Sequence, residues 1–212
     1  MKLHVVDGSP NARRVQAVVN HLGIHVQYIT HDLFKGELRD PQYMQLNPNA
    51  MAPTLVDGSF VLWESTAIVQ YLADKAGDVR LFPRDPQQRA DVVRWQCWQL
   101  AHLNRAFGEL AFETVAKASR GLPIDDRNVA NACAELSRFA PVLDAHMAQR
   151  HYLVTDNVTL ADYSMIAFEA YRSKVPFDWR PYTNVNAYFD HMHTAEPWVK
   201  AQQSVAPVTR AA

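Results

Sequence analysis

The first 76 residues alternate short apolar runs with helix-like periodicity. An apolar run over 3–6 precedes Ser9-Pro10, which supplies an N-cap and a proline at the first helical position. Apolar residues then recur every three or four positions as far as Gly23, a residue typical of a helix C-cap. A second strand-like run over 25–30 completes a predicted strand–helix–strand unit.

The next segment predicts a short helix, a hairpin and a longer helix. Asp40-Pro41 caps the short helix, and Asn47-Pro48 ends it because the residue before a proline is pushed out of the helical region. Asp57-Gly58 separates two apolar runs and is a strong hairpin signal. A helix over 65–76 follows. This order predicts a four-stranded mixed sheet with helices packed on it.

The rest of the chain has helical periodicity throughout. Residues 78–86 carry prolines and charges and are interpreted as a linker. Helices are predicted at about 86–118, 124–149, 159–173 and 181–193, with a short piece from Pro197. We therefore predict an α/β domain over 1–77, a linker over 78–86 and an all-helical bundle domain over 87–212.

The first long helix predicts its own buried face. Its apolar positions recur at alternating spacings of four and three, which is typical of one helix face turned toward a core. The predicted face consists of Val93, Cys97, Leu100, Asn104, Phe107 and Ala111. Asn104 is the polar member of this face.

Charge and composition exclude several classes of function. Lys plus Arg number 21 against 22 for Asp plus Glu, so no net field attracts nucleic acid or an anionic membrane. No apolar stretch approaches the length of a membrane span, and the amino-terminal segment does not have the pattern of a secretory signal. We expect a cytoplasmic protein. The two cysteines form no C-x-x-C pair and the nine histidines lack metal-ligand spacing, so neither a disulfide scaffold nor a metal site is expected.

Four motifs stand in a characteristic order. They are S-P-N-A-R-R-V over 9–15, N-P-N-A-M-A-P-T-L over 47–55, D-G-S-F-V-L-W-E-S-T-A-I over 57–68 and T-L-A-D over 159–162. In this order the chain resembles the cytosolic glutathione transferases along essentially its whole length. The resemblance implies a thioredoxin-like domain that binds glutathione, with a helical domain that contributes the pocket for a hydrophobic electrophile. It also implies a homodimer.

The turn before the first helix contains the candidates for activating the glutathione thiol. A free thiol has a pKa near 8.5, so the protein has to stabilise the thiolate. Ser9 resembles the catalytic serine of the phi, theta and delta classes, and its alternative role is that of a plain N-cap. Asn11 is the competitor, since S-P-N-A also resembles the T-P-N turn of the nu-class proteins, which favour disulfide reduction.

The resemblance implies further contacts for glutathione. Pro53 matches the cis-proline of the fold, so that Ala52 pairs with the cysteinyl unit like an added strand. Ser65 at a helix start suits the γ-glutamyl carboxylate, and Glu64 suits its ammonium group. Read without the family, Glu64-Ser65 is a strand-end acid followed by a capping serine.

The glycyl end departs from the family pattern. Leu38 and Met51 occupy places where relatives commonly carry charged or polar residues, and neither offers a charge to a carboxylate. Met51, next to Ala52-Pro53, is nevertheless expected among the residues that bind glutathione. Arg39 or Lys35 is expected to substitute, although each is also consistent with a solvated loop charge.

The helical domain supplies the remaining candidates. Asn104 either satisfies a buried network or lies beside glutathione at the dimer cleft. Trp98, His102, Phe107 and Phe112 are candidates for the electrophile pocket, although aromatic residues at helical spacing more often belong to a core. Thr159 and Asp162 form a capping box, which serves folding.

Three functions therefore remain open. The leading one is conjugation of the glutathione thiolate to a small hydrophobic electrophile. The second is a glutathione-dependent disulfide or hydroperoxide reductase that relies on Asn11. The third is a glutathione-transferase-like module that binds without catalysis.

Overall fold

The computed structural model describes residues 1–203, with only the backbone of Gln202 and Gln203, and divides into two compact units. The first unit combines residues 1–82 with the segment from 195 onwards, and the second spans 83–194. The predicted domains differ at the C-terminus, where the segment after 194 was assigned to the helical domain. The last nine residues of that predicted domain, 204–212, lie outside the described residues.

The first unit contains a four-stranded mixed sheet, as predicted. Its strands are β1 (Lys2–Val6), β2 (Gln27–His31), β3 (Thr54–Asp57) and β4 (Phe60–Trp63), in the order β2-β1-β3-β4. β1 and β2 are parallel, and β3 is antiparallel to both β1 and β4. Consequently β1, β2 and β4 finish at the end of the sheet where β3 begins. We call this end the carboxyl end of the sheet.

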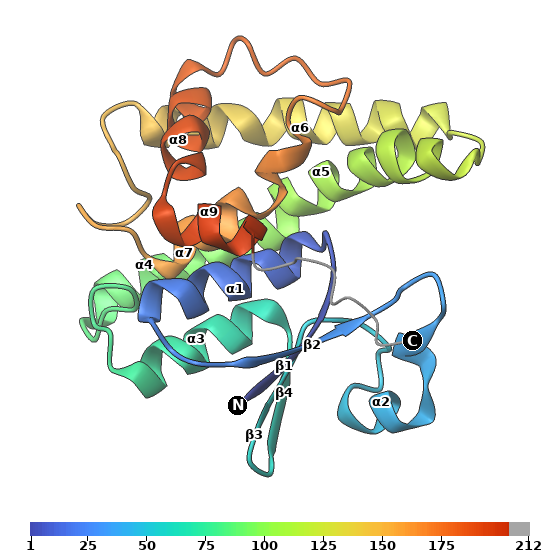
Figure 1. Ribbon diagram of the computed structural model, residues 1–212. Coiled ribbons are helices and arrows are strands. Elements are labelled where there is room, and N and C mark those ends of the chain that lie inside the picture. The colour runs from blue at the N-terminus through green and yellow to red at the C-terminus, as the bar shows by residue number, and fades with distance from the viewer. Residues whose placement is uncertain (204–212) are drawn as a thin grey trace. The chain divides into compact units, whose positions relative to one another are not determined.

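The described part of the first unit also contains helices. They are α1 (Pro10–Leu22), the short η1 (Glu37–Arg39), α2 (Pro41–Leu46), α3 (Ser65–Ala76) and α9 (Glu196–Gln203). α1 begins at Ser9, whose side chain accepts a hydrogen bond from the Ala12 N–H, and it ends at Gly23 in the left-handed conformation. α1 lies between α3 and α9 (Figure 1).

The packing of α9 explains why the C-terminal segment belongs to the first unit. Trp198 is fully buried, and the Arg13 guanidinium lies 3.7 Å from the centroid of its ring. The Asn20 amide donates to the Pro197 carbonyl at 3.1 Å. These contacts join α9 to α1 through apolar burial, a cation–π contact and a hydrogen bond.

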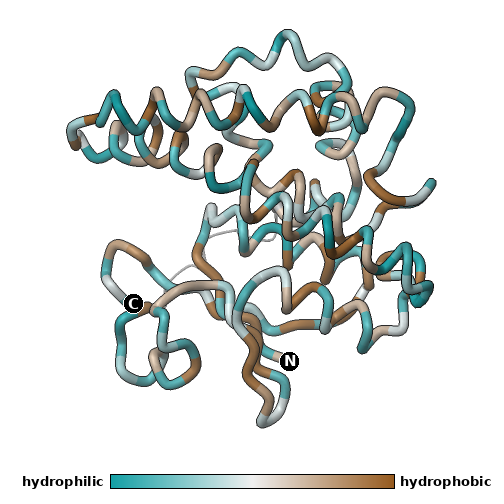
Figure 2. Tube along the Cα trace, turned by 180° about the vertical axis from the view of Figure 1, so that it is seen from behind, coloured by the Kyte–Doolittle hydropathy of each residue, from teal (hydrophilic) through white to brown (hydrophobic). Residues whose placement is uncertain are grey.

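The second unit is helical, as predicted, but its first long helix is interrupted. α4 (Pro86–Trp98) runs into a π-helical segment η2 (Gln99–Leu103), then α5 (Asn104–Ala111), a second π-helical segment η3 (Phe112–Ala116) and the short η4 (Ala118–Arg120). α6 (Asp126–Met147), α7 (Leu160–Met165), η5 (Ile166–Tyr171) and α8 (Thr183–His193) follow. The alternation of hydrophobic and hydrophilic positions along these helices is visible in Figure 2.

The predicted buried face of the first long helix is wrong in its first half. Cys97 and Leu100 are exposed, whereas Gln96 and Gln99 are buried. Phe107 and Ala111, beyond η2, are buried as expected. A π turn contains more residues than an α turn, so the inward face before η2 is displaced by one position from the α-helical spacing.

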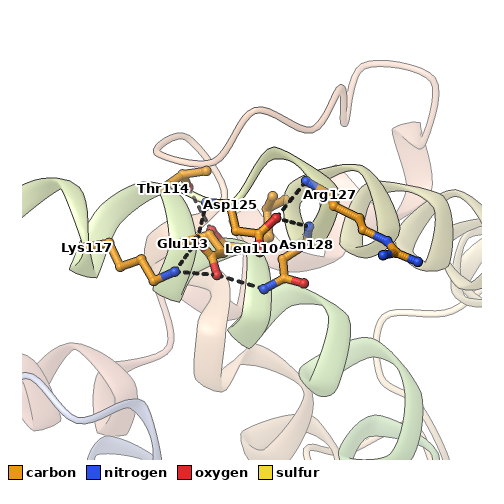
Figure 3. Close-up of polar contacts among 7 residues, drawn as sticks. All are labelled: Leu110, Glu113, Thr114, Lys117, Asp125, Arg127 and Asn128. Atoms are coloured by element: carbon orange, nitrogen blue, oxygen red, sulfur yellow. Dashed lines mark hydrogen bonds and ion pairs between the residues drawn. The ribbon is translucent and has the colours of Figure 1, made fainter. Parts of the chain in front are cut away.

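Polar side chains anchor the loops of the second unit. The buried Asp162 carboxylate accepts hydrogen bonds from the Thr159 N–H and the Leu153 N–H, which confirms the predicted capping box. Glu113 is 1% exposed and accepts hydrogen bonds from Lys117, the Asn128 amide and the Asp125 N–H (Figure 3). Glu113 thereby joins η3 to the start of α6.

Candidate functional site

Sheet register brings three of the sequence motifs to one end of the first unit. His4 is paired with Thr54, and Thr54 is paired with Trp63. The turn that follows β1, the loop that precedes β3 and the residues that follow β4 therefore all lie at the carboxyl end of the sheet. α1 and α3 both begin there, and neither has an acidic residue in its first turn. The positive ends of two helix dipoles thus lie at this end, as an anionic ligand requires.

Ser9 is half-exposed in the turn between β1 and α1. The turn passes through Gly8 at φ +75°, a conformation that favours glycine. The Ser9 oxygen accepts the Ala12 N–H at 3.3 Å and so acts as the N-cap of α1. Accepting that bond uses one lone pair and leaves the O–H proton to be donated. The capping role and a role toward a bound anion are therefore compatible. Asn11 is the second residue of α1 and is also half-exposed.

The loop before β3 is held by a buried polar network. Ala52-Pro53 is a cis peptide bond, as predicted, and Pro53 is buried. The carbonyl of Met51 accepts hydrogen bonds from the Tyr43 hydroxyl and the Asn47 amide, and both donors also contact the Thr54 hydroxyl. The residues on both sides of Ala52-Pro53 are thus fixed in place. The Met51 side chain itself is 64% exposed.

Glu64 and Ser65 form the junction between β4 and α3. Glu64 has φ 72° and ψ 109°, an uncommon conformation for a residue other than glycine. It places an exposed carboxylate immediately before the helix. Ser65 is 6% exposed, and no side chain among the described residues caps the start of α3. The first N–H groups of α3 are therefore left for another acceptor.

Arg14 is a residue at this end that sequence reasoning missed. It lies on α1, is fully buried, and donates from Nη1 to the Thr66 hydroxyl at 3.4 Å. Burial lowers the pKa of its guanidinium to about 10, partly offset by the charge of Glu64. The signal available in the sequence was the second of two consecutive arginines, at a position where α1 otherwise presents apolar residues.

The loop after β2 carries the candidates for the glycyl end. Lys35 and Arg39 are exposed, and Leu38 is buried. β2 is parallel to β1, so this loop also leaves the sheet at its carboxyl end. The structure therefore brings two exposed cations to the same end as Ser9.

The candidates in the helical unit do not form one group. Phe107 is buried and packs against Phe168 and Trp179, so it belongs to the core. Phe112 is 46% exposed. Phe107 and Phe112 thus have different surroundings, one in the core and one at the surface, and the electrophile pocket stays a prediction.

Trp98 and His102 contact each other, with 6.0 Å between their ring centroids. Both contact Phe139, and the His102 ring is stacked on Phe139 at 4.5 Å between centroids. Trp98 also lines a cavity of about 340 Å³ together with Arg94, Trp95, Val142 and His146. Asn104 is half-buried, and its Oδ1 accepts no hydrogen bond within residues 1–203.

Metal binding and membrane insertion are two other features to consider in the described residues. Within residues 1–203, no three His, Cys, Asp or Glu side chains gather closely enough to hold a metal ion. Over the same residues, none of the helices combines the length and the apolar character needed to cross a membrane.

Comparison with known proteins gives the family. The model of the glutathione S-transferase N-terminal domain matches residues 3–80, and that of the C-terminal domain matches residues 107–196. Glutathione S-transferase 2 of Anopheles gambiae is 30% identical over 97% of this chain and 96% of its own length. The chain belongs to the glutathione S-transferase family.

Other glutathione S-transferases agree in sequence and fold. Glutathione S-transferase D6 of Drosophila melanogaster is 28% identical over 93% of this chain and 89% of its own length. The structure of a delta-class glutathione transferase from Nilaparvata lugens superposes with a TM-score of 0.83 at 30% identity, covering 96% of this chain and 93% of the other. The predictions of the fold, of the family and of a glutathione transferase are confirmed.

Proposed function

We propose that this glutathione S-transferase joins the thiolate of glutathione to a small hydrophobic electrophile, with Ser9 as the residue that stabilises the thiolate. The observation that carries the proposal is the state of Ser9: its oxygen already caps α1, and its O–H proton is left to donate to sulfur. Lowering the pKa of a thiol by about two units takes roughly 2.7 kcal/mol. A hydrogen bond together with the dipole of α1 supplies energy of that order.

The γ-glutamyl end of glutathione is assigned to the start of α3. The uncapped N–H groups of α3 and the Ser65 hydroxyl suit its carboxylate, and the exposed Glu64 suits its ammonium group. Ala52 presents its backbone to the cysteinyl unit, and the exposed Met51 side chain lies beside it. Lys35 and Arg39 are the candidates for the glycyl carboxylate.

Asn11 supports a second candidate function. It is half-exposed in the first turn of α1, two residues from Ser9, so its amide is also available to the glutathione sulfur. A disulfide or hydroperoxide reductase that relies on Asn11 is therefore kept as the alternative. The third candidate function is a module that binds without catalysis. It is favoured by Leu38 and Met51, since neither side chain offers a charge to the glycyl carboxylate of glutathione.

Substitutions at Ser9 separate its two roles. Ser9→Ala removes both the cap and the donor, Ser9→Thr keeps both, and Ser9→Asp keeps the cap but has no donor. We expect conjugation of a chloronitrobenzene and the ultraviolet absorbance of the bound thiolate to be retained in Ser9→Thr and lost in the other two. Only Ser9→Ala should also lose stability, by about 1 kcal/mol.

The same assays distinguish the alternatives. An unchanged thiolate absorbance in Ser9→Ala and Ser9→Asp overturns the role of Ser9. Rapid disulfide turnover that disappears in Asn11→Ala, with weak conjugation, selects the reductase. Failure of the wild-type protein to bind immobilised glutathione selects the non-catalytic module.

The surroundings of the protein are proposed on the same basis. We place it in the cytoplasm as a homodimer without a metal ion, and its second substrate is a hydrophobic electrophile. Light scattering of the purified protein measures the mass of the assembly, and metal analysis by mass spectrometry measures bound ions.

A further inference from the structure

Arg14 presents an imbalance of charge in the interior of the first unit. The residue has no exposed surface, and its Nε and Nη2 atoms have no hydrogen-bond partner within residues 1–203. Within the same residues, the guanidinium donates a hydrogen bond from Nη1 to the Thr66 hydroxyl at 3.4 Å. No carboxylate of the described residues lies in ion-pair contact with it. Buried charges in proteins are ordinarily paired, because an unpaired charge destabilises the folded state.

The position of the guanidinium adds to this imbalance. Thr66 is the second residue of α3, so the hydrogen bond places Arg14 beside the first turn of that helix. The N-terminus of a helix already carries partial positive charge. Glu64, just before α3, is the acid whose charge acts on Arg14, and its side chain is exposed. Two positive features, the guanidinium and the N-terminal end of α3, thus lie side by side.

We propose that Arg14 is a positioning residue for a carboxylate bound at the start of α3, the γ-glutamyl α-carboxylate of glutathione. The inference rests on the proposed function and deepens it. The arriving carboxylate is the counter-charge that the guanidinium lacks, and Arg14 acts on it from behind the first turn of α3. Since Glu64 is engaged by the ammonium group of the same ligand, the carboxylate remains to balance Arg14.

This assignment predicts how the site discriminates between ligands. Glutathione has the α-carboxylate, whereas 4-aminobutanoyl-cysteinylglycine has the same chain, amine and thiol without it. Neutralising Arg14 should weaken the binding of glutathione and leave the binding of the analogue nearly unchanged. A residue that only supports the fold would affect both ligands alike.

The experiment is calorimetric titration of both ligands into the full chain and its variants. In Arg14→Met and Arg14→Gln we expect the dissociation constant of glutathione to rise about tenfold, equivalent to about 1.4 kcal/mol, and that of the analogue to change less than about twofold. Arg14→Lys, which keeps the charge, should retain most of the discrimination. Thr66→Val removes the hydrogen bond but keeps the guanidinium, so it should raise the dissociation constant of glutathione by less than about threefold.

Thermal unfolding supplies a second measurement. Replacing an unpaired buried charge by an apolar side chain of similar length commonly leaves a protein as stable or more stable. We therefore expect Arg14→Met to unfold at the same or a higher temperature while it loses the preference for glutathione. If Arg14 only supports the fold, Arg14→Met should unfold at a lower temperature and should lose affinity for both ligands equally. That result overturns the inference.

The outcomes separate this inference from the proposed function. Wild-type protein that binds neither ligand contradicts the proposed function itself. Wild-type protein that prefers glutathione, with the same preference in Arg14→Met, contradicts only the role of Arg14. The role of Arg14 would also be contradicted if Thr66→Val weakened glutathione binding as much as Arg14→Met does. The hydrogen bond, and not the charge, would then determine the affinity.

Discussion

Acid should destabilise the first unit through His4, a buried residue of β1. His4 Nδ1 lies 2.8 Å from His31 Nε2, and the two rings are stacked with Tyr43 against both of them. One nitrogen of this pair has to donate and the other accept, so at least one of the two rings is neutral and the two cannot both be charged in the hydrogen-bonded arrangement. Burial, the charge of His31 and that of Lys2 lower the pKa of His4 to about 4.

The direction and the size of the change in stability with pH follow from the difference in proton binding between the folded and unfolded chain. The pKa of His4 is lower in the folded state than the 6.5 of a free histidine, so the unfolded chain binds more protons between these values. The contribution of His4 to stability is complete above pH 6.5, falls as the pH is lowered, and is lost near pH 4. A difference between 6.5 and about 4 corresponds to roughly 3 kcal/mol, taken as an upper value.

The perturbation is His4→Gln, which keeps a polar side chain but cannot titrate. We expect urea unfolding to show that the variant loses about 2 to 3 kcal/mol less stability than wild type between pH 7.5 and pH 4.5. His25→Gln is the control, because it alters an exposed histidine of the same unit. It should lose as much stability as wild type between pH 7.5 and pH 4.5. An equal loss in His4→Gln and wild type, or an NMR titration of His4 near pH 6.5, would refute the reasoning.

Three further substitutions test the folding of the units by thermal unfolding and hydrogen exchange. Asp162→Asn removes the buried carboxylate from the capping box and should lower the free energy of unfolding by about 3 kcal/mol. A decrease of less than about 1 kcal/mol would contradict the role of Asp162. Glu113→Gln should speed amide exchange around the start of α6, where Asp125 N–H loses a charged acceptor, and unchanged exchange rates would argue against this link. Ala50 has φ 52°, so Ala50→Gly should raise stability by up to about 1 kcal/mol, and a decrease would show that the loop tolerates alanine without strain.

Local signals in the sequence were sufficient for most element boundaries and for the motifs. Ser9-Pro10 predicts the start of α1, Asp57-Gly58 predicts the turn between β3 and β4, and the Thr159 to Asp162 motif predicts the start of α7. These features depend on hydrogen bonds and backbone angles within a few residues, so no distant contact is needed to decide them. The order of the elements then restricts the topology to the observed mixed sheet.

The candidate site was predictable as a set of residues but incomplete as a set of interactions. Pro53, Glu64 and Ser65 are recognisable from their motifs, and sheet register then brings them to one end. Arg14 is not recognisable in this way, because an arginine on a helix is ordinarily solvated. Its burial becomes evident only when α3 is placed beside α1.

Long-range packing decided the remaining features. The π-helical segments of the long helix depend on which side chains face the core, and no local preference marks them, so the predicted face at Cys97 and Leu100 failed. The union of α9 with the first unit likewise depends on Trp198 meeting α1 across a long separation in sequence. Sequence by itself determined the elements and the family, because caps, turns and periodicity act over a few residues. The tertiary structure decided which polar and apolar groups are buried together, because burial is a property of neighbours brought together by the whole fold.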